Sequence, residues 1–294
     1  MGVFSSASRY PHIAQRVFRG ILTLVLAFFL SASLLRFAPG WNVEERDMDP
    51  RFSASTVKEL RGERAAKRDL IPFYMTFLGQ LISGDLGTSE LFARPVRDLI
   101  AERAPVTLMS VSIGLFSAWA MALAVATVTS RDKNGIATAG AATFSGALLS
   151  CPSALLAILC LIFGLQPAWA IMAVIFPRAF PHAHEQLRDQ FRAPHIVMAR
   201  SRGIAGLRLY RSHILPGVLP ALAALAGASV PLAFGAAIPI ESLGDSPGLG
   251  QLAWRAALGR DMPLLVSLTL LLTMVAVLAN LAADVALSWV RWRE

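Results

Sequence analysis

Three histidines that could do chemistry gather between residues 182 and 195. His184 begins the sequence His-Glu-Gln-Leu-Arg, which starts like the H-E-x-x-H pattern of zinc proteases. That pattern needs two histidines one helical turn apart to hold the metal, and Arg188 stands where the second is required. His182, His184 and His195 could form another kind of metal cluster, but solvated loop histidines are the default interpretation. We therefore expect no metal.

Other catalytic patterns are absent from the sequence. It contains no G-x-S-x-G nucleophile elbow and no G-x-x-x-x-G-K-[ST] phosphate-binding loop. We therefore expect a chain that is not an enzyme, holds no cofactor and does not bind ATP itself in the P-loop manner.

The composition is that of a membrane protein. Of the 294 residues 55% are hydrophobic, and the mean hydropathy is +0.56, which is too apolar for an ordinary soluble domain. A helix that crosses the hydrocarbon core, roughly 30 Å thick, needs about 20 mostly apolar residues. Six stretches meet or approach this length, and each predicts a span: 17–35, 107–128, 136–163, 168–180, 215–240 and 263–290.

The arginines in the connections predict the orientation, because basic residues accumulate in cytoplasmic loops. Arg9 and Arg16 precede the first span without any acid. The loop after the fourth span has seven arginines against Glu185 and Asp189. These arginines are Arg178, Arg188, Arg192, Arg200, Arg202, Arg208 and Arg211. With six spans, both termini and this loop are cytoplasmic, and the net charge of +8 reflects topology rather than nucleic-acid binding.

The stretch SRGIAGLRLYRSHILPGVLP (201–220) connects this basic loop to the fifth span. Pro194 can begin a helix, Gly203 can end one, and residues 207–215 can resume a helix towards the membrane. The pattern predicts a short helix on the membrane surface, a glycine corner and a return into the bilayer. The alternative is a basic loop that only orients the chain.

The same stretch resembles the cytoplasmic loop of ABC-transporter permeases, whose pattern runs from Glu-Ala-Ala to a glycine and then to I-x-L-P. Gly203, Leu215 and Pro216 match that pattern, and Ala199 matches its second alanine. The form A-R-S-R-G…R-S-H-I-L-P is most similar to the dipeptide, oligopeptide and nickel permeases. Further segments resemble that family in the same order along the chain: 83–108, 150–158, 241–265 and 280–289.

The sequence departs from the family pattern at a few places. Val197 and Met198 stand where the family has Glu-Ala, and Ile214 lies one place after the expected isoleucine. The external connection between spans three and four, about 164–167, is shorter than the resemblance leads us to expect.

The resemblance implies an all-α membrane protein with six transmembrane helices, the type I ABC importer permease fold and a cytoplasmic coupling helix. It implies a place in the bacterial inner membrane and partners that include two ATP-binding-cassette ATPase subunits, which bind the ATP. A second homologous permease, an extracytoplasmic solute-binding protein and membrane lipid complete the set, and nucleic acid is not among the partners. The cargo would be a peptide, a nickel complex or another small solute.

Seven residues are implied as the coupling site for the ATPase: Ala199, Arg200, Arg202, Gly203, His213, Leu215 and Pro216. A surface helix can dock in a groove of a separate subunit. The arginines could pair with acids of the ATPase or serve only for orientation. We expect three regions: residues 1–40 (tail and first span), 41–105 (extracytoplasmic) and 106–294 (five-span core), with the coupling loop at 182–213. The alternative function is an unpowered channel or scaffold that keeps the permease fold.

The predicted orientation can be tested with thiol labelling in intact cells. A cysteine placed at Glu63 should react with a membrane-impermeant reagent, and one at Ser201 should not, because the two positions are predicted on opposite sides. Equal labelling of the two variants would refute the six-span arrangement.

Overall fold

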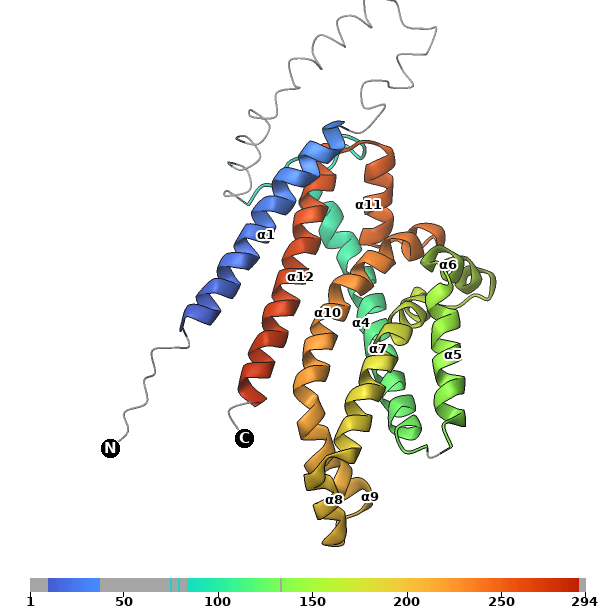
Figure 1. The fold of residues 1–294 in the computed structure, drawn as a ribbon. Helices are drawn as coiled ribbons and strands as arrows, with labels where there is room; N and C mark the ends of the chain where they lie inside the picture. Colours follow the sequence, from blue (N-terminus) through green and yellow to red (C-terminus); the bar gives the residue numbers. More distant parts are fainter. Residues whose placement is uncertain (1–9, 38–74, 76–78, 80–83, 133, 291–294) are drawn as a thin grey trace, which may run out of the picture. The chain divides into compact units, whose positions relative to one another are not determined.

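The computed structural model describes residues 10–37, 75, 79, 84–132 and 134–290. The predictions made for residues 41–74, 76–78 and 80–83 therefore lie outside the described residues. The described chain is helical apart from turns and a single isolated bridge between Thr88 and Pro95. Its helices, drawn in Figure 1, are α1 (Tyr10–Phe37), α4 (Val96–Thr129), α5 (Ile136–Ser150), α6 (Ser153–Ile162), α7 (Pro167–Arg192), α8 (Pro194–Ser201), α9 (Gly206–Leu209), the π-helix η3 (Tyr210–Ile214), α10 (Leu215–Leu243), α11 (Leu249–Leu258) and α12 (Met262–Val290).

The helices belong to two compact units. The first comprises residues 1–102 and 255–271, and the second comprises 103–254 and 272–294. The second unit contains α5 to α10, and α7 packs against α5, α6 and α10. Fully buried side chains of α7, among them Ile171, Ile175 and Leu187, form the centre of its core.

Three described helical segments are long and apolar enough to cross a membrane: α4, the continuous run Gly206–Leu243 and residues Met262–Asp284 of α12. They confirm apolar helices at the predicted second, fifth and sixth spans. The apolar stretch Phe18–Leu30 lies within α1, where the first span is predicted. The count of six spans stays a prediction.

The predicted third span contains a bend that was not foreseen from the sequence. α5 and α6 meet at a bend of 95°. The cause is Pro152, because a proline disfavours the helical conformation in the residue before it. Cys151 is accordingly extended, with φ −80° and ψ 125°, and its N–H donates to the carbonyl of Leu148, at 3.1 Å.

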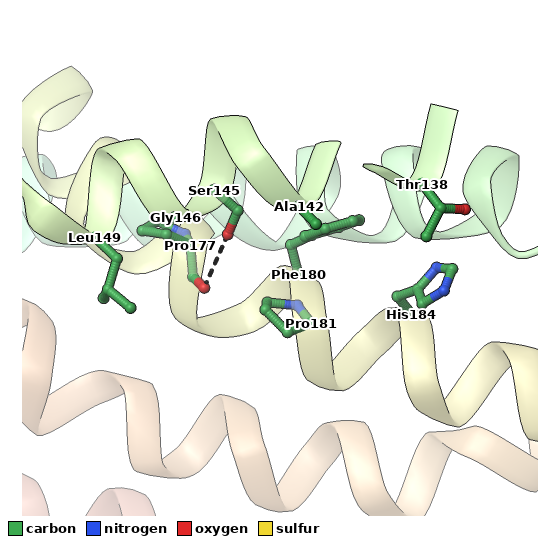
Figure 2. A pocket seen from close by; sticks show the side chains of 9 residues that line it. All are labelled: Thr138, Ala142, Ser145, Gly146, Leu149, Pro177, Phe180, Pro181 and His184. Atoms are coloured by element: carbon green, nitrogen blue, oxygen red, sulfur yellow. Dashed lines mark hydrogen bonds between the residues drawn. The ribbon is translucent and has the colours of Figure 1, made fainter. Parts of the chain in front are cut away.

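The helix at the predicted fourth span is longer than that span, because α7 continues through Pro177 and Pro181 as far as Arg192. The stretch predicted as a loop from residue 182 therefore begins as helix. Pro181 has no N–H to donate to the carbonyl of Pro177. The Ser145 hydroxyl of α5 donates to that carbonyl instead, at 3.1 Å (Figure 2). A neighbouring helix thus repairs the hydrogen bond that the proline removes.

A buried carboxylate holds together the loop 84–95 and the start of α12, both in the first unit. Asp261, fully buried between α11 and α12, accepts hydrogen bonds from the Ser89 hydroxyl, from the Leu91 N–H at 3.1 Å and from the Leu264 N–H at 3.2 Å. It thereby fastens the loop 84–95 to the turn that begins α12. Ser89 and Asp261 come from two of the segments that resembled the permease family, so the structure gives those segments a shared structural role.

Replacing Asp261 by alanine should destabilise this loop. The hydroxyl and two amides would lose their acceptor, at a cost of roughly 3 kcal/mol. The thermal unfolding midpoint of the purified protein should fall, and a protease should cleave the loop 84–95 faster. Asp98→Ala is the matched control, because Asp98 is exposed in the first turn of α4. Equal behaviour of the two variants would show that Asp261 does not hold the loop.

Candidate functional site

The surface helix predicted before Gly203 is present as α8. Pro194 occupies its first turn, where a missing N–H costs nothing, and Ala193 before it is extended. Ile196 and Ala199 are buried, whereas Val197 and Met198 are 56% and 59% exposed. α8 therefore has one face packed against the rest of the second unit and one apolar face that is exposed.

Gly203 ends α8 through a Schellman motif, as predicted from its residue type. Its φ is +80°, a conformation that only glycine adopts without steric cost. Its N–H donates to the carbonyl of Arg200 at 2.9 Å, and the Ile204 N–H donates to the carbonyl of Ala199 at 3.1 Å. The corner between α8 and the next helix is therefore fixed by hydrogen bonds.

The helix resumes at Gly206, which also has a positive φ of 62°, and runs without interruption from α9 through η3 into α10. The predicted resumption of the helix towards the fifth span is confirmed, but its π-helical turn was not foreseen. In this turn the Leu215 N–H donates to the carbonyl of Tyr210, five residues earlier. Pro216 stands in the first turn of α10 and can make no such bond. The π-helical turn therefore ends just before Pro216.

Side chains that the sequence reasoning missed hold this surface segment in place. The hydroxyl of Tyr210 lies 3.2 Å from that of Thr127 on α4. Phe191, at the end of α7, lies beneath the guanidinium groups of Arg131 and Arg200, 5.3 and 5.8 Å from its ring centroid. These contacts join the segment to the ends of α4 and α7. An aromatic residue among arginines is the sequence signal that could have suggested them.

The predicted site residues divide into two groups in the structure. Arg200, Arg202 and Gly203 are exposed at the end of α8 and at its corner, and Pro216 is exposed at the start of α10. Ala199 is buried, while His213 and Leu215 are half-buried. The second group can position the segment but cannot form the outer surface of a binding site.

The exposed surface of this segment combines apolar and positive side chains. Leu207 is 69% exposed and adds to Val197 and Met198. The four arginines of the segment, Arg200, Arg202, Arg208 and Arg211, are also exposed. The sequence contains no Asp or Glu from residue 193 to residue 240, so the segment itself supplies no acid to neutralise them. In Figure 1 α8 and α9 lie together at one end of α7 and α10.

A cavity of about 260 Å³ lies between α5 and α7 and is mostly apolar. Figure 2 shows Ala142, Leu149, Phe180 and Pro181 along it, with Thr138 and His184 at one end. The His184 Nδ1 lies 2.8 Å from the Thr129 hydroxyl, so this histidine is tied to α4 rather than free in a loop. The described residues contain no group of three side chains that could hold a metal ion.

Asp132 stabilises the turn between α4 and α5. Its carboxylate accepts hydrogen bonds from the backbone N–H groups of Asn134, Ala137 and Thr138 at 3.0, 2.8 and 3.3 Å. Desolvation acts to raise the pKa of Asp132, but the backbone donors together outweigh it and hold the pKa below its usual value. The carboxylate also lies at the positive end of the α5 helix dipole.

A second buried carboxylate lies at the other end of α10. Glu241 is fully buried, and its Oε2 accepts hydrogen bonds from the Thr107 hydroxyl at 3.0 Å and from the Gly250 N–H at 2.7 Å. The Thr107 hydroxyl in turn accepts from the Leu249 N–H, at 2.7 Å. A Cβ at Gly248 would collide with the carboxylate. These residues close the turn after α10 over α4.

The long apolar helices define a multi-pass membrane protein. Sequence comparison then gives the family. The chain belongs to the binding-protein-dependent transport system inner membrane components, and the family pattern matches residues 110–293.

Individual relatives agree with this family. The chain is 27% identical over 300 residues to the oligopeptide transport system permease protein OppB of Haemophilus influenzae, with 93% of this chain and 95% of the relative covered. It is 24% identical over 302 residues to a putative peptide permease protein of Brucella ovis, covering 92% and 95%. Among solved structures, the MetNI methionine ABC transporter in an inward-facing conformation shares the fold, with a TM-score of 0.57 and 19% identity, over 65% of this chain and 96% of that chain.

Replacing Gly203 by valine tests the corner after α8. A Cβ there would meet no atom within 4 Å, so the cost comes from the left-handed backbone alone, about 1–2 kcal/mol. That is enough to redirect α8 but too little to prevent insertion. We expect normal abundance in the membrane and a loss of most transport.

Gly235→Val is the control, because Gly235 also has open space around it but lies within α10 at a helical conformation. If the Gly203 variant transports normally, residues 194–216 would serve only to orient the chain in the membrane, and they would have no role in coupling.

Proposed function

We propose that this chain is the permease subunit of an ATP-driven importer of peptides and that it couples to separate ATPase subunits through α8 and α9. The observation that carries this proposal is the exposed surface of that segment. Val197, Met198 and Leu207 would be exposed to water in an isolated subunit, and exposed apolar groups rimmed by polar ones mark interaction sites.

The surface suggests what kind of groove it enters. A short amphipathic helix binds by inserting its apolar face into a hydrophobic groove. The four exposed arginines around that face favour acidic residues at the rim of the groove, because the segment itself supplies no acid to pair with them. The family pattern has Glu-Ala where this chain has Val197 and Met198, so this docking contact is apolar at that point. The ATPase partner therefore carries an apolar groove with an acidic rim.

The segment is also connected so that it can transmit movement. The helical run Gly206–Leu243 continues from the surface into the membrane, and the Tyr210–Thr127 contact joins it to α4. A displacement of α8 by the ATPase subunits would tilt α10 and α4 together. Rocking of helix bundles around a fixed path is the usual mode of alternating access.

The cargo and the further partners are proposed from the relatives, which are named as peptide and oligopeptide permeases. We assign this chain peptide cargo, two ATPase subunits, a second homologous permease and an extracytoplasmic solute-binding protein. Both termini and α8 lie on the cytoplasmic side, where the arginine-rich connections belong. The coupling residues are those that shape or expose the docking surface: Ala199, Arg200, Arg202, Gly203, His213, Leu215 and Pro216.

Co-purification with the ATPase subunits tests the coupling. Met198→Asp puts a charge on the apolar face of α8, and a buried unpaired charge at an interface costs several kcal/mol. We expect the variant to insert normally but to lose the ATPase subunits during purification, with ATP-driven uptake of peptide abolished.

Leu165→Asp is the matched control. Leu165 is 50% exposed in the turn between α6 and α7, at the opposite end of α7 from α8. Retention of the ATPase by the Met198 variant would contradict docking through α8. Absence of ATPase from the unsubstituted complex would favour the unpowered channel or scaffold.

A further inference from the structure

The break between α5 and α6 lies within the depth of the membrane. α5 has 15 residues and starts beside the charged Arg131 and Asp132, which mark the aqueous boundary. At 1.5 Å per residue it rises about 22 Å, which is less than the hydrocarbon thickness of roughly 30 Å. α6 turns away at 95° and adds almost no height. The extended residues Cys151 and Pro152 therefore lie inside the bilayer.

Backbone polar groups are left without helical partners at this break. Pro152 supplies no N–H, and among the described residues no backbone N–H donates to the carbonyl of Cys151. The last carbonyl groups of a helix find no N–H donor within their own helix. The first N–H groups of α6 receive no side-chain cap.

Hydrocarbon does not tolerate such a segment. Non-helical backbone at membrane depth occurs only where protein covers it or where it lines a water-filled cavity. Ser150 and Pro152 are exposed, so the described residues of the chain leave the break uncovered. The surroundings of the break must therefore be water or another subunit.

The flank of α5 that leads to the break favours water. Thr143, Gly146, Ala147 and Ser150 share one helical face, and all four are exposed and small. The hydroxyls of Thr143 and Ser150 donate to the carbonyls of Ala139 and Gly146 in the same helix, and α6 contrasts with this small-residue face through its large, exposed Leu161 and Ile162. Small side chains beside a break leave room for a solute to approach its carbonyl groups.

We propose that the break at residues 149–153 lines the water-filled translocation path and that the carbonyl of Cys151, which receives no backbone N–H from the described residues, accepts a hydrogen bond from an N–H group of the peptide cargo, whereas the carbonyl of Pro152 already accepts from Leu155 and Leu156. This inference rests on the proposed import function. Backbone carbonyls recognise the ammonium terminus and amide N–H groups that all peptides share. The site therefore binds cargo without selecting its side chains.

The chain's two cysteines provide the experiment, because Cys151 lies in the break and Cys160 lies on α6. Cys160→Ser leaves Cys151 as the only thiol, and Cys151→Ser leaves Cys160. Each variant is assembled with its partner subunits in membranes and treated with a charged methanethiosulfonate or with the apolar N-ethylmaleimide. A charged reagent needs a thiolate in water, so Cys151 should react with it at least about tenfold faster than Cys160. Trialanine at saturating concentration should slow the reaction of Cys151.

Each other outcome overturns the proposal. Reaction of Cys151 with N-ethylmaleimide alone places the break against lipid, and no reaction with either reagent places it against another subunit. If trialanine does not slow the labelling of Cys151, the break does not contact the cargo. Because labelling requires water access and not ATPase activity, loss of the ATPase subunits would refute the proposed function while leaving the water-lined break in place.

Removal of the break gives a second measurement. Pro152→Ala restores an N–H and allows α5 to continue, so the charged reagent should label Cys151 at least about fivefold more slowly, with peptide uptake reduced to match. Pro167→Ala is the matched control, since Pro167 stands at the start of α7 where a missing N–H costs nothing. Unchanged labelling and uptake in the Pro152 variant, with its insertion confirmed, would contradict the proposal.

Discussion

Hydrogen bonding of the backbone inside the membrane is the constraint on which this structure depends. Proline removes an N–H and disturbs the turn before it, and the described spans contain several prolines. The chain responds in different ways. Ser145 repairs the gap that Pro181 leaves in α7, the π-helical turn before Pro216 widens the helix, and at Pro152 the helix breaks. The repaired sites keep helices straight enough to pack, whereas the unrepaired site exposes polar backbone.

Buried carboxylates perform the corresponding task outside the helices. Asp261 in the first unit and Glu241 in the second each collect hydrogen bonds from a hydroxyl and from backbone N–H groups. A charged acceptor makes stronger hydrogen bonds than a neutral one, and removal of a buried acceptor leaves all its donors unpaired. Each carboxylate therefore fixes the course of an irregular segment with one side chain. This explains why the permease-like segments 83–108 and 241–265 supply these residues.

The sequence predicted the features that depend on local rules. Pro194 and Gly203 marked the ends of α8 because a first-turn proline and a left-handed glycine act within one turn of helix. Apolar length located three of the spans. The tertiary pairings could not be read in this way. Thr127 and Tyr210 are 83 residues apart, and nothing in either residue type identifies the other. The break at Pro152 was missed because hydropathy averages over a window and a single proline barely changes it.

The arrangement of α8 explains why a corner is needed rather than a flexible loop. A flexible connection would absorb a displacement of the docked helix, whereas a Schellman corner followed by an unbroken helix passes it on. Arg200 shows how closely docking and positioning are linked, since its carbonyl accepts the Gly203 N–H and its guanidinium covers Phe191 at the end of α7. Ala199 packs inward on the same turn, so α8 cannot roll without disturbing the core. Because both the corner and the packing are fixed, α8 docked as we propose would pass a force on its exposed face to α7 and α10.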